Sequence, residues 1–173
     1  MFYVGWLACV VGAGRGRLWL GPVVVGALVA LHVYFAGQRK AEAAFVAALG
    51  AFGFAVDTAQ ASLGVYVFRQ TNFAPWLCPP WMVALWMLFA ITLGASLGWL
   101  RGRPLLAAAA GAVGGPLSYL AGERLGAIDL STTPAWSLAA IGVVWALALP
   151  AAFAIRQTVY AGVAGVAQEV RAV

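Results

Sequence analysis

Residues 43–68 read AAFVAALGAFGFAVDTAQASLGVYVF, an apolar stretch long enough to cross a membrane, with one acidic side chain, Asp57, and no basic one. Asp57 lies near the middle, far from the flanking charges of Glu42 and Arg69. A charge at the centre of a bilayer costs about 3 kcal/mol on insertion scales, so such a group usually faces a partner, a cavity or a pathway rather than lipid. The stretch predicts a transmembrane helix and makes Asp57 the first candidate for a functional residue.

The composition of the whole chain agrees with a membrane location. Of its 173 residues, 64% are hydrophobic and only 9% are charged, and the mean hydropathy is +0.94. Soluble domains carry about 25% charged residues. In the bilayer core, backbone N–H and C=O groups must form hydrogen bonds with each other, because no water is present. The long uninterrupted apolar runs predict helices, since the strands of a membrane barrel alternate apolar and polar residues. We expect an all-α fold, a polytopic transmembrane helical bundle forming a single integral membrane domain over residues 1–173.

Length sets the expected number of spans, at about 20 residues per crossing. The first apolar segment gives only about 20 Å of helix, so the expected six spans become five if this segment is half-inserted. The tail, residues 156–173, carries valines at steps of four and three. It is predicted to be an interfacial amphipathic helix or an extension of the last span. The spans are expected near residues 2–14, 18–36, 43–68, 80–100, 104–122 and 135–155.

The basic residues indicate an orientation. With six spans, one side of the membrane receives six Lys and Arg residues and the other receives four. The excess favours both termini in the cytoplasm. The net charge of +5 and the pI near 9.8 do not indicate nucleic-acid binding, because the charges lie at predicted helix ends and form no basic patch with aromatic residues. The two sets are Arg39, Lys40, Arg101, Arg103, Arg156 and Arg171 against Arg15, Arg17, Arg69 and Arg124.

Small residues cover two faces of the span that contains Asp57. Such faces allow close helix approach in membranes, so we expect this helix to be surrounded by neighbours. Asp57 would then point into the protein, with Gln60 one turn further on. Gly94 and Gly98 form a GxxxG pair in the fourth span, which also predicts packing. One face of the third span holds Gly50, Gly53, Asp57, Ala61 and Gly64, and the other holds Ala43, Ala47, Ala51, Ala55 and Ala59.

The stretch GGPLSYLAGERLGA, residues 114–127, combines a helix-breaking proline with polar groups. Pro116 removes a backbone donor and favours a kink. Ser118 and Tyr119 add hydroxyl groups, and Glu123 and Arg124 close the segment. Broken helices with polar groups often form ligand sites in membrane proteins, which makes these four side chains candidates. The alternative is a kinked packing helix with an ordinary charged end.

Residues 69–81, RQTNFAPWLCPPW, are predicted to form a structured loop that leads into the fourth span, with its tryptophans at the membrane interface. Alternatively, an amphipathic ligand stacks on these rings, so Trp81 joins the candidates. The candidate ligand-binding residues are therefore Asp57, Gln60, Ser118, Tyr119, Glu123, Arg124 and Trp81.

Motifs for catalysis, metals and cofactors are missing from the sequence. His32 is the only histidine, and Cys9 and Cys78 form no CxxC or zinc spacing. The run GAGRGR lacks the Lys-Ser/Thr ending of a phosphate loop. Paired carboxylates would have to combine Asp57 with Glu123 or Asp129. We expect no metal and no cofactor, and the sequence defines no catalytic residue.

The order of these features resembles an uncharacterised family of small bacterial inner-membrane proteins, a domain of unknown function with multiple transmembrane helices. Besides Asp57, the matching stretches are GWLACVVGA (5–13), PPWMVALWMLFAITLGASLGWL (79–100) and GGPLSYLAGERLGA (114–127). The resemblance implies a location in the bacterial inner (cytoplasmic) membrane. It also implies relatives encoded near fatty-acid-modifying enzymes, and hence a link to lipid metabolism or envelope stress.

Three functions remain open at this point. The first is a non-enzymatic membrane protein that binds, carries or scaffolds a lipid-like or small organic molecule, with Asp57 lining the site. The second is a membrane-embedded, lipid-modifying enzyme using Asp57 or Glu123 as a base and Tyr119 or Ser118 as its partner. In the third, Asp57 only fixes helix packing in a structural or assembly subunit of a membrane complex. The expected partners are the lipid bilayer, a lipid-like ligand and another membrane protein, but no nucleic acid.

Overall fold

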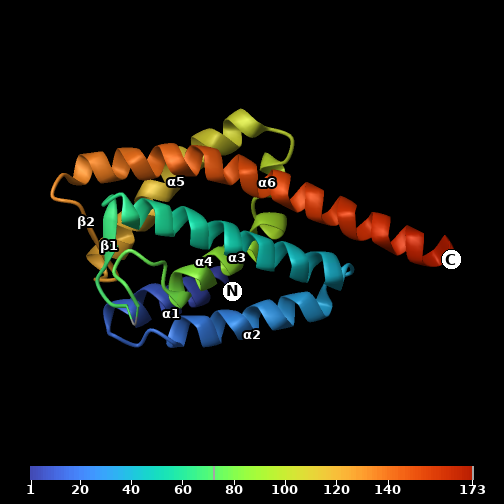
Figure 1. Cartoon of the computed structure of the whole chain (residues 1–173), viewed down its shortest axis with the longest axis horizontal. Helices are drawn as coiled ribbons and strands as arrows, with labels where there is room; N and C mark the ends of the chain where they lie inside the picture. Colours follow the sequence, from blue (N-terminus) through green and yellow to red (C-terminus); the bar gives the residue numbers. More distant parts are fainter. Residues whose placement is uncertain (72, 173) are drawn as a thin grey trace.

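The computed structural model describes residues 1–71 and 73–172, with side chains described up to residue 166 (Figure 1). Within these residues, six α-helices form an up-and-down bundle in which α1, α3 and α5 run toward one end and α2, α4 and α6 run back. We call the first end, where two short strands pair, the strand end. The helices are α1 (Phe2–Gly14), α2 (Leu20–Phe35), α3 (Arg39–Ser62), α4 (Pro80–Ala95), α5 (Pro104–Arg124) and α6 (Pro134–Ala172).

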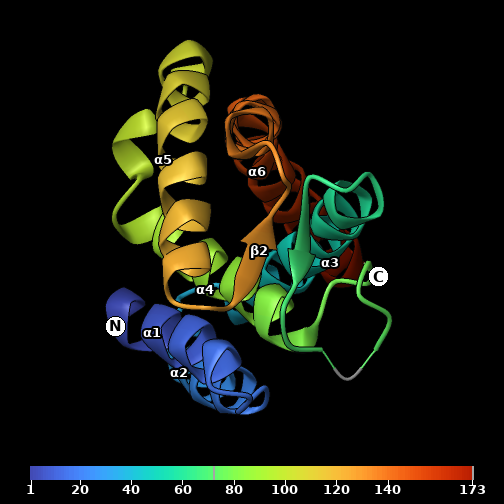
Figure 2. The same cartoon turned by 90° about the vertical axis from the view of Figure 1, so that its left-hand side faces the viewer.

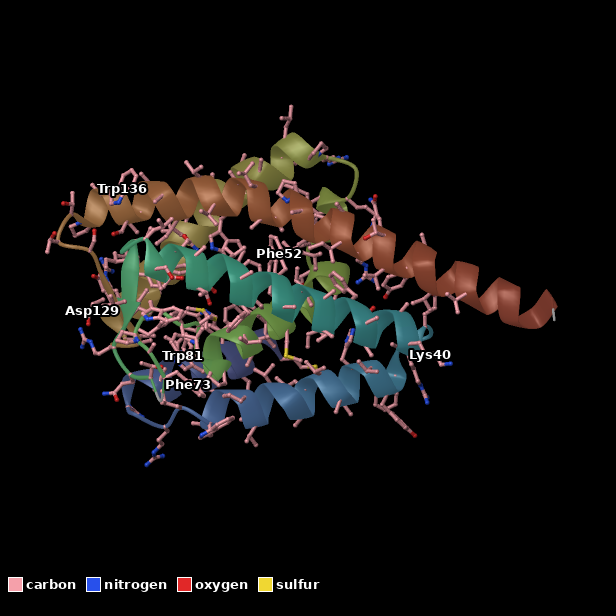
Figure 3. The ribbon with its side chains drawn as sticks, in the orientation of Figure 1. Lys40, Phe52, Phe73, Trp81, Asp129 and Trp136 are labelled. Carbon is pink, nitrogen blue, oxygen red and sulfur yellow. The ribbon has the colours of Figure 1, made fainter. Side chains whose placement is uncertain are left out.

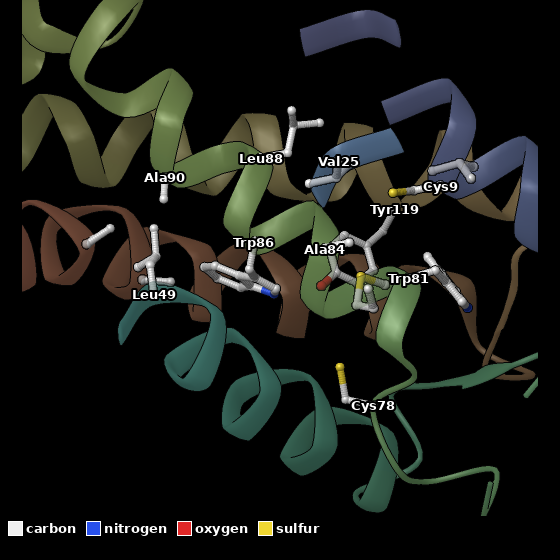
Figure 4. Packing of buried hydrophobic residues seen from close by; sticks show 14 of the residues in the cluster. Cys9, Val25, Leu49, Cys78, Trp81, Ala84, Trp86, Leu88, Ala90 and Tyr119 are labelled. Carbon is white, nitrogen blue, oxygen red and sulfur yellow. The ribbon is translucent and has the colours of Figure 1, made fainter. Parts of the chain in front are cut away.

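Helix α4 lies at the centre of the bundle, against α1, α2 and α3 (Figure 2). Leu88 of α4 is fully buried, and it packs so closely on Gly5 of α1 that a Cβ there would lie 2.8 Å from the leucine side chain. Cys9, Val25 and Leu49 bring α1, α2 and α3 onto the same core (Figure 4). An apolar helix surrounded by other helices is expected to be hydrophobic on all sides, as α4 is.

The most extensive helix pair is α5 with α6, and glycines make the close approach possible. A Cβ at Gly111 would lie 2.1 Å from the carbonyl oxygen of Trp145. On the opposite side of this contact, Gly142 faces the carbonyl oxygen of Ala112, the acceptor that Pro116 leaves without its helical donor. Helix α5 is therefore continuous through Pro116 instead of broken there, because α6 packs directly over the proline turn.

The prediction of a helix through residue 68 is wrong at its C-terminal end. Helix α3 ends at Ser62, and Gly64 takes a left-handed conformation with φ of +71°. The N–H of Val65 then bonds to the carbonyl of Gln60 at 3.0 Å, which is a Schellman cap. Helix α5 ends with the same cap around Gly126, whose φ is +78°.

After these two caps the chain forms the only regular pairing of strands in the described residues. Strand β1 (Tyr66–Phe68) pairs antiparallel with β2 (Ile128–Leu130), with Val67 opposite Asp129. The fold is therefore all-helical except for this two-stranded connection, which ties the ends of α3 and α5 together.

Only one of the two small-residue faces of α3 is covered by neighbours. Gly50, Gly53, Asp57 and Ala61 are buried, as expected, but the alanine ridge from Ala43 to Ala59 is exposed. The prediction that α3 is enclosed on both faces is wrong, because α4 and α6 cover one side of it only.

The predicted GxxxG face of the fourth span does not form either. Helix α4 ends at Ala95, and Gly98 begins a short 3₁₀ turn with open space around it.

Three helices, α3, α5 and α6, are long and apolar enough to cross a membrane. The other three helices are apolar but shorter. Helix α6 continues without a break through the predicted tail to Ala172 and extends beyond the rest of the bundle (Figure 1). The tail is thus a continuation of the last helix, the second of the two expectations for it.

Candidate functional site

Asp57 is completely buried, and four side chains donate hydrogen bonds to its carboxyl group. Three donors meet Oδ1: the hydroxyl of Tyr119 at 2.5 Å, the hydroxyl of Tyr66 at 2.6 Å and the amide of Gln60 at 3.3 Å. The indole N–H of Trp86 donates to Oδ2 at 2.6 Å. One carboxyl group thereby joins α3, β1, α4 and α5.

The position of Trp86 follows from a glycine and a second tryptophan. Its indole lies directly on Gly53, where a Cβ would be 2.0 Å from the ring carbon Cγ. Its other face stacks on Trp145 of α6, with ring centroids 4.8 Å apart and planes 10° apart. The indole is therefore held between α3 and α6, with its N–H directed at Asp57.

The partners of Asp57 are all neutral donors. Among the described residues, no Lys, Arg or His lies within ion-pair distance of this carboxyl group. Buried polar groups need hydrogen-bond partners, and both oxygens of Asp57 have them. Both oxygens of the carboxyl group thus accept hydrogen bonds from the protein, and these bonds orient the side chains of Tyr66, Trp86 and Tyr119.

A cavity of about 640 Å³ lies beside this network, between α1, α4, α5 and α6. Tyr119 and Trp86 belong both to its wall and to the network around Asp57. Asp57 itself does not line this cavity, because the two aromatic side chains lie between it and the cavity. The wall is almost entirely apolar and aromatic, with Phe2, Tyr3, Trp6, Trp81, Phe89 and Trp145 as its other aromatic members.

The cavity opens on the outer surface of the bundle between α1 and α5. Tyr3 and Leu117, two of its lining residues, are 77% and 61% exposed. Trp81 and Tyr119 line it as well and are only 1% and 5% exposed, so they form its interior. The exposed lining residue Leu117 lies within α5 and not at its end, which indicates an opening on the side of the helices.

Two tryptophans of the wall have a buried indole N–H without a hydrogen-bond partner in the described part of the chain. The indole N–H groups of Trp81 and Trp145 are buried and make no hydrogen bond to the described residues. The two other tryptophans of the wall do make one, since Trp6 donates to the hydroxyl of Ser118 at 3.4 Å and Trp86 donates to Asp57.

The structure brings some predicted site residues together and leaves others apart. Asp57, Gln60 and Tyr119 share one network, and Ser118, Tyr119 and Trp81 line the cavity. Glu123 instead accepts the backbone N–H of Leu130 at 3.3 Å, and Arg124 is exposed. Neither Glu123 nor Asp129 is a partner of Asp57 in the described network, so the paired carboxylates considered for an enzyme do not form.

Asp129 has a partner of its own at the strand end. Arg69 donates two hydrogen bonds to its carboxylate through Nε, each of 3.2 Å, and a further one through a terminal guanidinium nitrogen. This hydrogen bonding lowers the pKa of Asp129 and raises that of Arg69. The pair lies across the β1–β2 connection and is largely exposed.

A second polar cluster lies near the other end of the bundle. Glu42 is 5% exposed; its Oε1 lies 3.0 Å from Nε2 of His32, and its Oε2 accepts the hydroxyl of Tyr160. The guanidinium of Arg156 lies 3.5 Å from the same Oε2 and stacks on the ring of Phe45 at 5.2 Å. This cluster connects α2, α3 and α6.

The described residues contain no group of three or more His, Cys, Asp or Glu side chains arranged for a metal ion.

Sequence reasoning missed Tyr66, Trp86 and Trp145. Tyr66 falls in the segment that was predicted to be helical, so its return toward Asp57 after the Gly64 cap was not foreseen. Trp86 and Trp145 are in helices that are apolar on several faces, so no periodicity marks the inward side. The one available signal was the glycine face of α3, since a residue such as Gly53 leaves room for a large neighbour.

Fold and site together define an all-helical protein with a buried carboxyl group behind an apolar, aromatic cavity. The chain belongs to a family whose model is described as a protein of unknown function (DUF2878), and this model matches residues 1–151. The resemblance to an uncharacterised family is thereby confirmed. No curated protein and no solved structure matches the chain.

Proposed function

We propose that this protein is an integral protein of the bacterial inner membrane that binds a lipid-like or small organic molecule in the cavity between α1, α4, α5 and α6. The observation that carries the proposal is the cavity itself, which has an apolar, aromatic wall and opens sideways between α1 and α5. A sideways opening on an apolar surface gives a molecule dissolved in the bilayer direct access.

The surface of the bundle supports a membrane location. Large apolar side chains on the flanks of the helices are exposed, among them Leu105 (86%) and Leu147 (70%). The charged residues Lys40 and Asp129 mark the two ends of the bundle, with Trp136 near the strand end (Figure 3). Exposed aromatic side chains at the ends of membrane helices are typical of the interface. Those at the strand end are Trp19, Phe73, Trp76 and Trp136, and those at the other end are Tyr34, Phe35 and Trp99.

In this proposal all six helices cross the bilayer. Helices α1, α2 and α4 give about 20–24 Å of helix at 1.5 Å per residue, shorter than a typical hydrocarbon core, which local thinning of the bilayer can accommodate. Arg39, Lys40, Arg101 and Arg103 lie at the ends of helices opposite the strand end. The positive-inside rule then places that end, and both termini, in the cytoplasm.

The cavity has the size and shape of a ligand site. Its volume of about 640 Å³ falls within the usual 300–1,000 Å³ of small-molecule pockets. Its lining residues on α5, from Ala110 to Gly122, extend over about 18 Å of helix. An elongated molecule would fit such a space along the helix.

Asp57 contributes to this site as a positioning residue. The hydroxyl of Tyr119 and the indole of Trp86 are fixed by hydrogen bonds to it, and both rings form part of the cavity wall. A catalytic role for Asp57 or Glu123 has less support, because neither side chain lines the cavity. Binding needs only a preformed wall, which the Asp57 network supplies.

The proposal can be tested by filling the cavity. Gly114 lines it, and a Cβ added there meets no atom within 4 Å, so the backbone position accepts a side chain and Gly114→Phe adds a ring at the cavity. Gly162→Phe on α6 is the matched control, since its Cβ also meets nothing and it is remote from the cavity lining. Both proteins would be extracted in lipid nanodiscs and analysed by native mass spectrometry for co-purifying small molecules.

We expect the wild type and Gly162→Phe to retain a bound molecule and Gly114→Phe to lose it. Bound mass that is equal in all three proteins, or absent from the wild type in every membrane extract, would overturn the proposal. Release of the protein from membranes by carbonate washing would overturn the membrane location.

A further inference from the structure

The opening of the cavity lies between α1 and α5, two helices that pack mainly on other partners. Helix α1 packs on α2 and α4, and α5 packs on α6. Both run toward the strand end, where they touch: a Cβ at Gly14 would lie 2.1 Å from the carbonyl oxygen of Leu125, the residue that follows α5. Away from this contact, the side chains between the two helices decide how wide the opening is.

One side-chain hydrogen bond crosses the opening. Trp6, about 12 Å from Gly14 along α1, donates its indole N–H to the hydroxyl of Ser118 on α5 over 3.4 Å. Both residues line the cavity, and Ser118 is exposed on the outer surface beside Leu117. Among the described residues this is the only hydrogen bond that joins α1 to α5. The Trp6 side chain therefore lies across the opening at the level of Ser118.

Trp6 is held less firmly than the other tryptophans of the cavity wall. Trp86 and Trp145 stack on each other with ring centroids 4.8 Å apart, and Trp81 packs edge-on against Phe68 at 5.9 Å. No aromatic ring of the described chain pairs with Trp6. Its hydrogen bond is also long, since N–H···O bonds usually measure about 2.7–3.2 Å. Rotation of Trp6 out of the wall therefore breaks one weak hydrogen bond and no ring stack.

The backbone of α1, by contrast, is fixed on both sides of Trp6. A Cβ at Gly5 would lie 2.8 Å from the side chain of Leu88 on α4. A Cβ at Gly21 on α2 would lie 2.6 Å from the Cα of Cys9 on α1. A shift of α1 away from α5 would open these close contacts, and protein interiors resist such a loss of packing. The opening widens at lower cost by rotation of one side chain than by movement of the helix.

Resting on the proposed function, we infer that Trp6 is a side-chain gate of the cavity: its indole, held across the opening by Ser118, rotates away to let an apolar molecule pass between the bilayer and the cavity. Such a gate acts on rates. It is closed both before and after binding, so weakening the closed position speeds entry and exit by the same factor and leaves the dissociation constant unchanged. A substitution in an ordinary wall contact acts differently, because it changes mainly the exit rate and with it the affinity.

Stopped-flow fluorescence of the full-length protein in detergent tests the gate. The probe is 1-bromododecane, whose bromine atom quenches tryptophan fluorescence on contact, so Trp81, Trp86 and Trp145 report a probe molecule inside the cavity. Mixing with micelles that carry the probe measures the entry rate, and mixing the loaded protein with empty micelles measures the exit rate. Quenching of tryptophans on the outer surface rises linearly with probe concentration, whereas quenching from the cavity saturates.

Ser118→Ala removes the acceptor of Trp6 and leaves every tryptophan of the wall in place. We expect it to raise the entry and exit rates by the same factor, about two- to tenfold for the loss of one neutral hydrogen bond, with an unchanged dissociation constant. Trp6→Phe removes the same bond from its other side. The double variant should therefore show less than the product of the two single effects.

Two further variants are controls. Ser118→Thr keeps the hydroxyl group and should keep the wild-type rates. Ser62→Ala removes another exposed helical hydroxyl, on α3 and outside the cavity lining, and should also leave both rates unchanged. Because Ser118→Ala alters only an exposed side chain, the test does not depend on how well Trp6→Phe folds.

The outcomes separate the gate from the binding site. If the probe enters the cavity but Ser118→Ala and Trp6→Phe leave both rates at the wild-type values, Trp6 is not the gate, and the cavity still binds apolar molecules. A change in the exit rate and the affinity alone would make Trp6 a wall contact and would also overturn the gate. If the wild type shows no saturable quenching, the cavity takes up no apolar molecule, and the proposed function falls together with the gate.

Discussion

The indole N–H of Trp86 donates to Oδ2 of Asp57 at 2.6 Å, and this bond joins the centre of α4 to α3 where both residues are buried. Among the donors to Asp57, the hydroxyls of Tyr66 and Tyr119 can also accept a hydrogen bond, whereas the indole N–H of Trp86 only donates. The side chain of residue 57 must therefore present an acceptor atom to Trp86. At the same time its other oxygen, Oδ1, accepts hydrogen bonds from three further donors.

Asp57→Asn is expected to destabilise the protein although it keeps the shape of the side chain. The amide has one acceptor oxygen, so either Trp86 loses its acceptor or the hydroxyls of Tyr66 and Tyr119 must turn to accept from the amide N–H groups. The free energy of unfolding should fall by about 1–3 kcal/mol, the cost of leaving a buried donor unsatisfied. Chemical unfolding in a fixed detergent measures it. In a cycle with Trp86→Phe, the double variant should lose less than the sum of the single variants; strict additivity would contradict the assigned bond.

Gly53→Ala is expected to be far more harmful than Gly50→Ala on the same helix face. A Cβ at Gly53 would lie 2.0 Å from the ring of Trp86, which is fixed between α3 and Trp145. At Gly50 it would lie 3.1 Å from the Met87 side chain, which is flexible and can move. Overpacking typically costs about 1–3 kcal/mol. Near-ultraviolet circular dichroism and the unfolding midpoint test this, and equal stability of the two variants would argue against the tight Trp86 packing.

Glu42→Gln is expected to loosen α6 from α2 and α3. The substitution removes the charge that faces Arg156, whose second terminal nitrogen is buried without a partner among the described residues. Removing one member of a buried ion pair costs about 3 kcal/mol or more, because the other charge is left uncompensated. The unfolding midpoint should fall strongly. Arg156→Gln combined with Glu42→Gln should restore part of the loss, and a double variant as unstable as the sum would show that the pair does not act as a unit.

Acid should weaken the connection between β1 and β2. The hydrogen bonds from Arg69 lower the pKa of Asp129 below its usual value of 3.8, so their stabilisation is complete above that pH and is lost as the pH falls through the lowered pKa. The pair is 49% and 43% exposed, so the effect should be small and reduced by salt. Amide hydrogen exchange of β2, followed as the pH falls below about 4, measures it. Asp129→Asn should remove the pH dependence, and an unchanged profile would contradict it.

Asp57 shows how far the sequence alone leads. Its burial and its place on the glycine face of α3 follow from one acid in an apolar helix, and Tyr119, another candidate residue, donates a hydrogen bond to it. The hydrogen bond between them links residues 62 positions apart, and local patterns carry no information on such a distance. The structure places Asp57 behind two aromatic residues of the cavity wall, Trp86 and Tyr119, and not in the wall itself.

The errors in the predicted helices have local causes. Gly64 stands in an apolar run and was counted as part of a helix, but its left-handed conformation ends α3 and starts a strand. The three-residue strand β1 depends on pairing with β2, and the sequence around Tyr66 does not predict this distant partner. Glu123 and Arg124 were chosen because they are charged near a proline. A charged helix end is common, and here Glu123 serves the backbone of β2.

The four donors of Asp57 also imply an order of assembly during synthesis, which proceeds from the N-terminus. Gln60 and Tyr66 lie three and nine residues from the acid, so they are available almost at once. Trp86 follows 29 residues later and Tyr119 only after 62. The last donor to arrive, Tyr119, belongs to the cavity wall, as Trp86 does. A nascent chain that stops before α5 would hold an acid with an incomplete set of partners, and the cavity is completed only later, when α6 adds Trp145 to its wall.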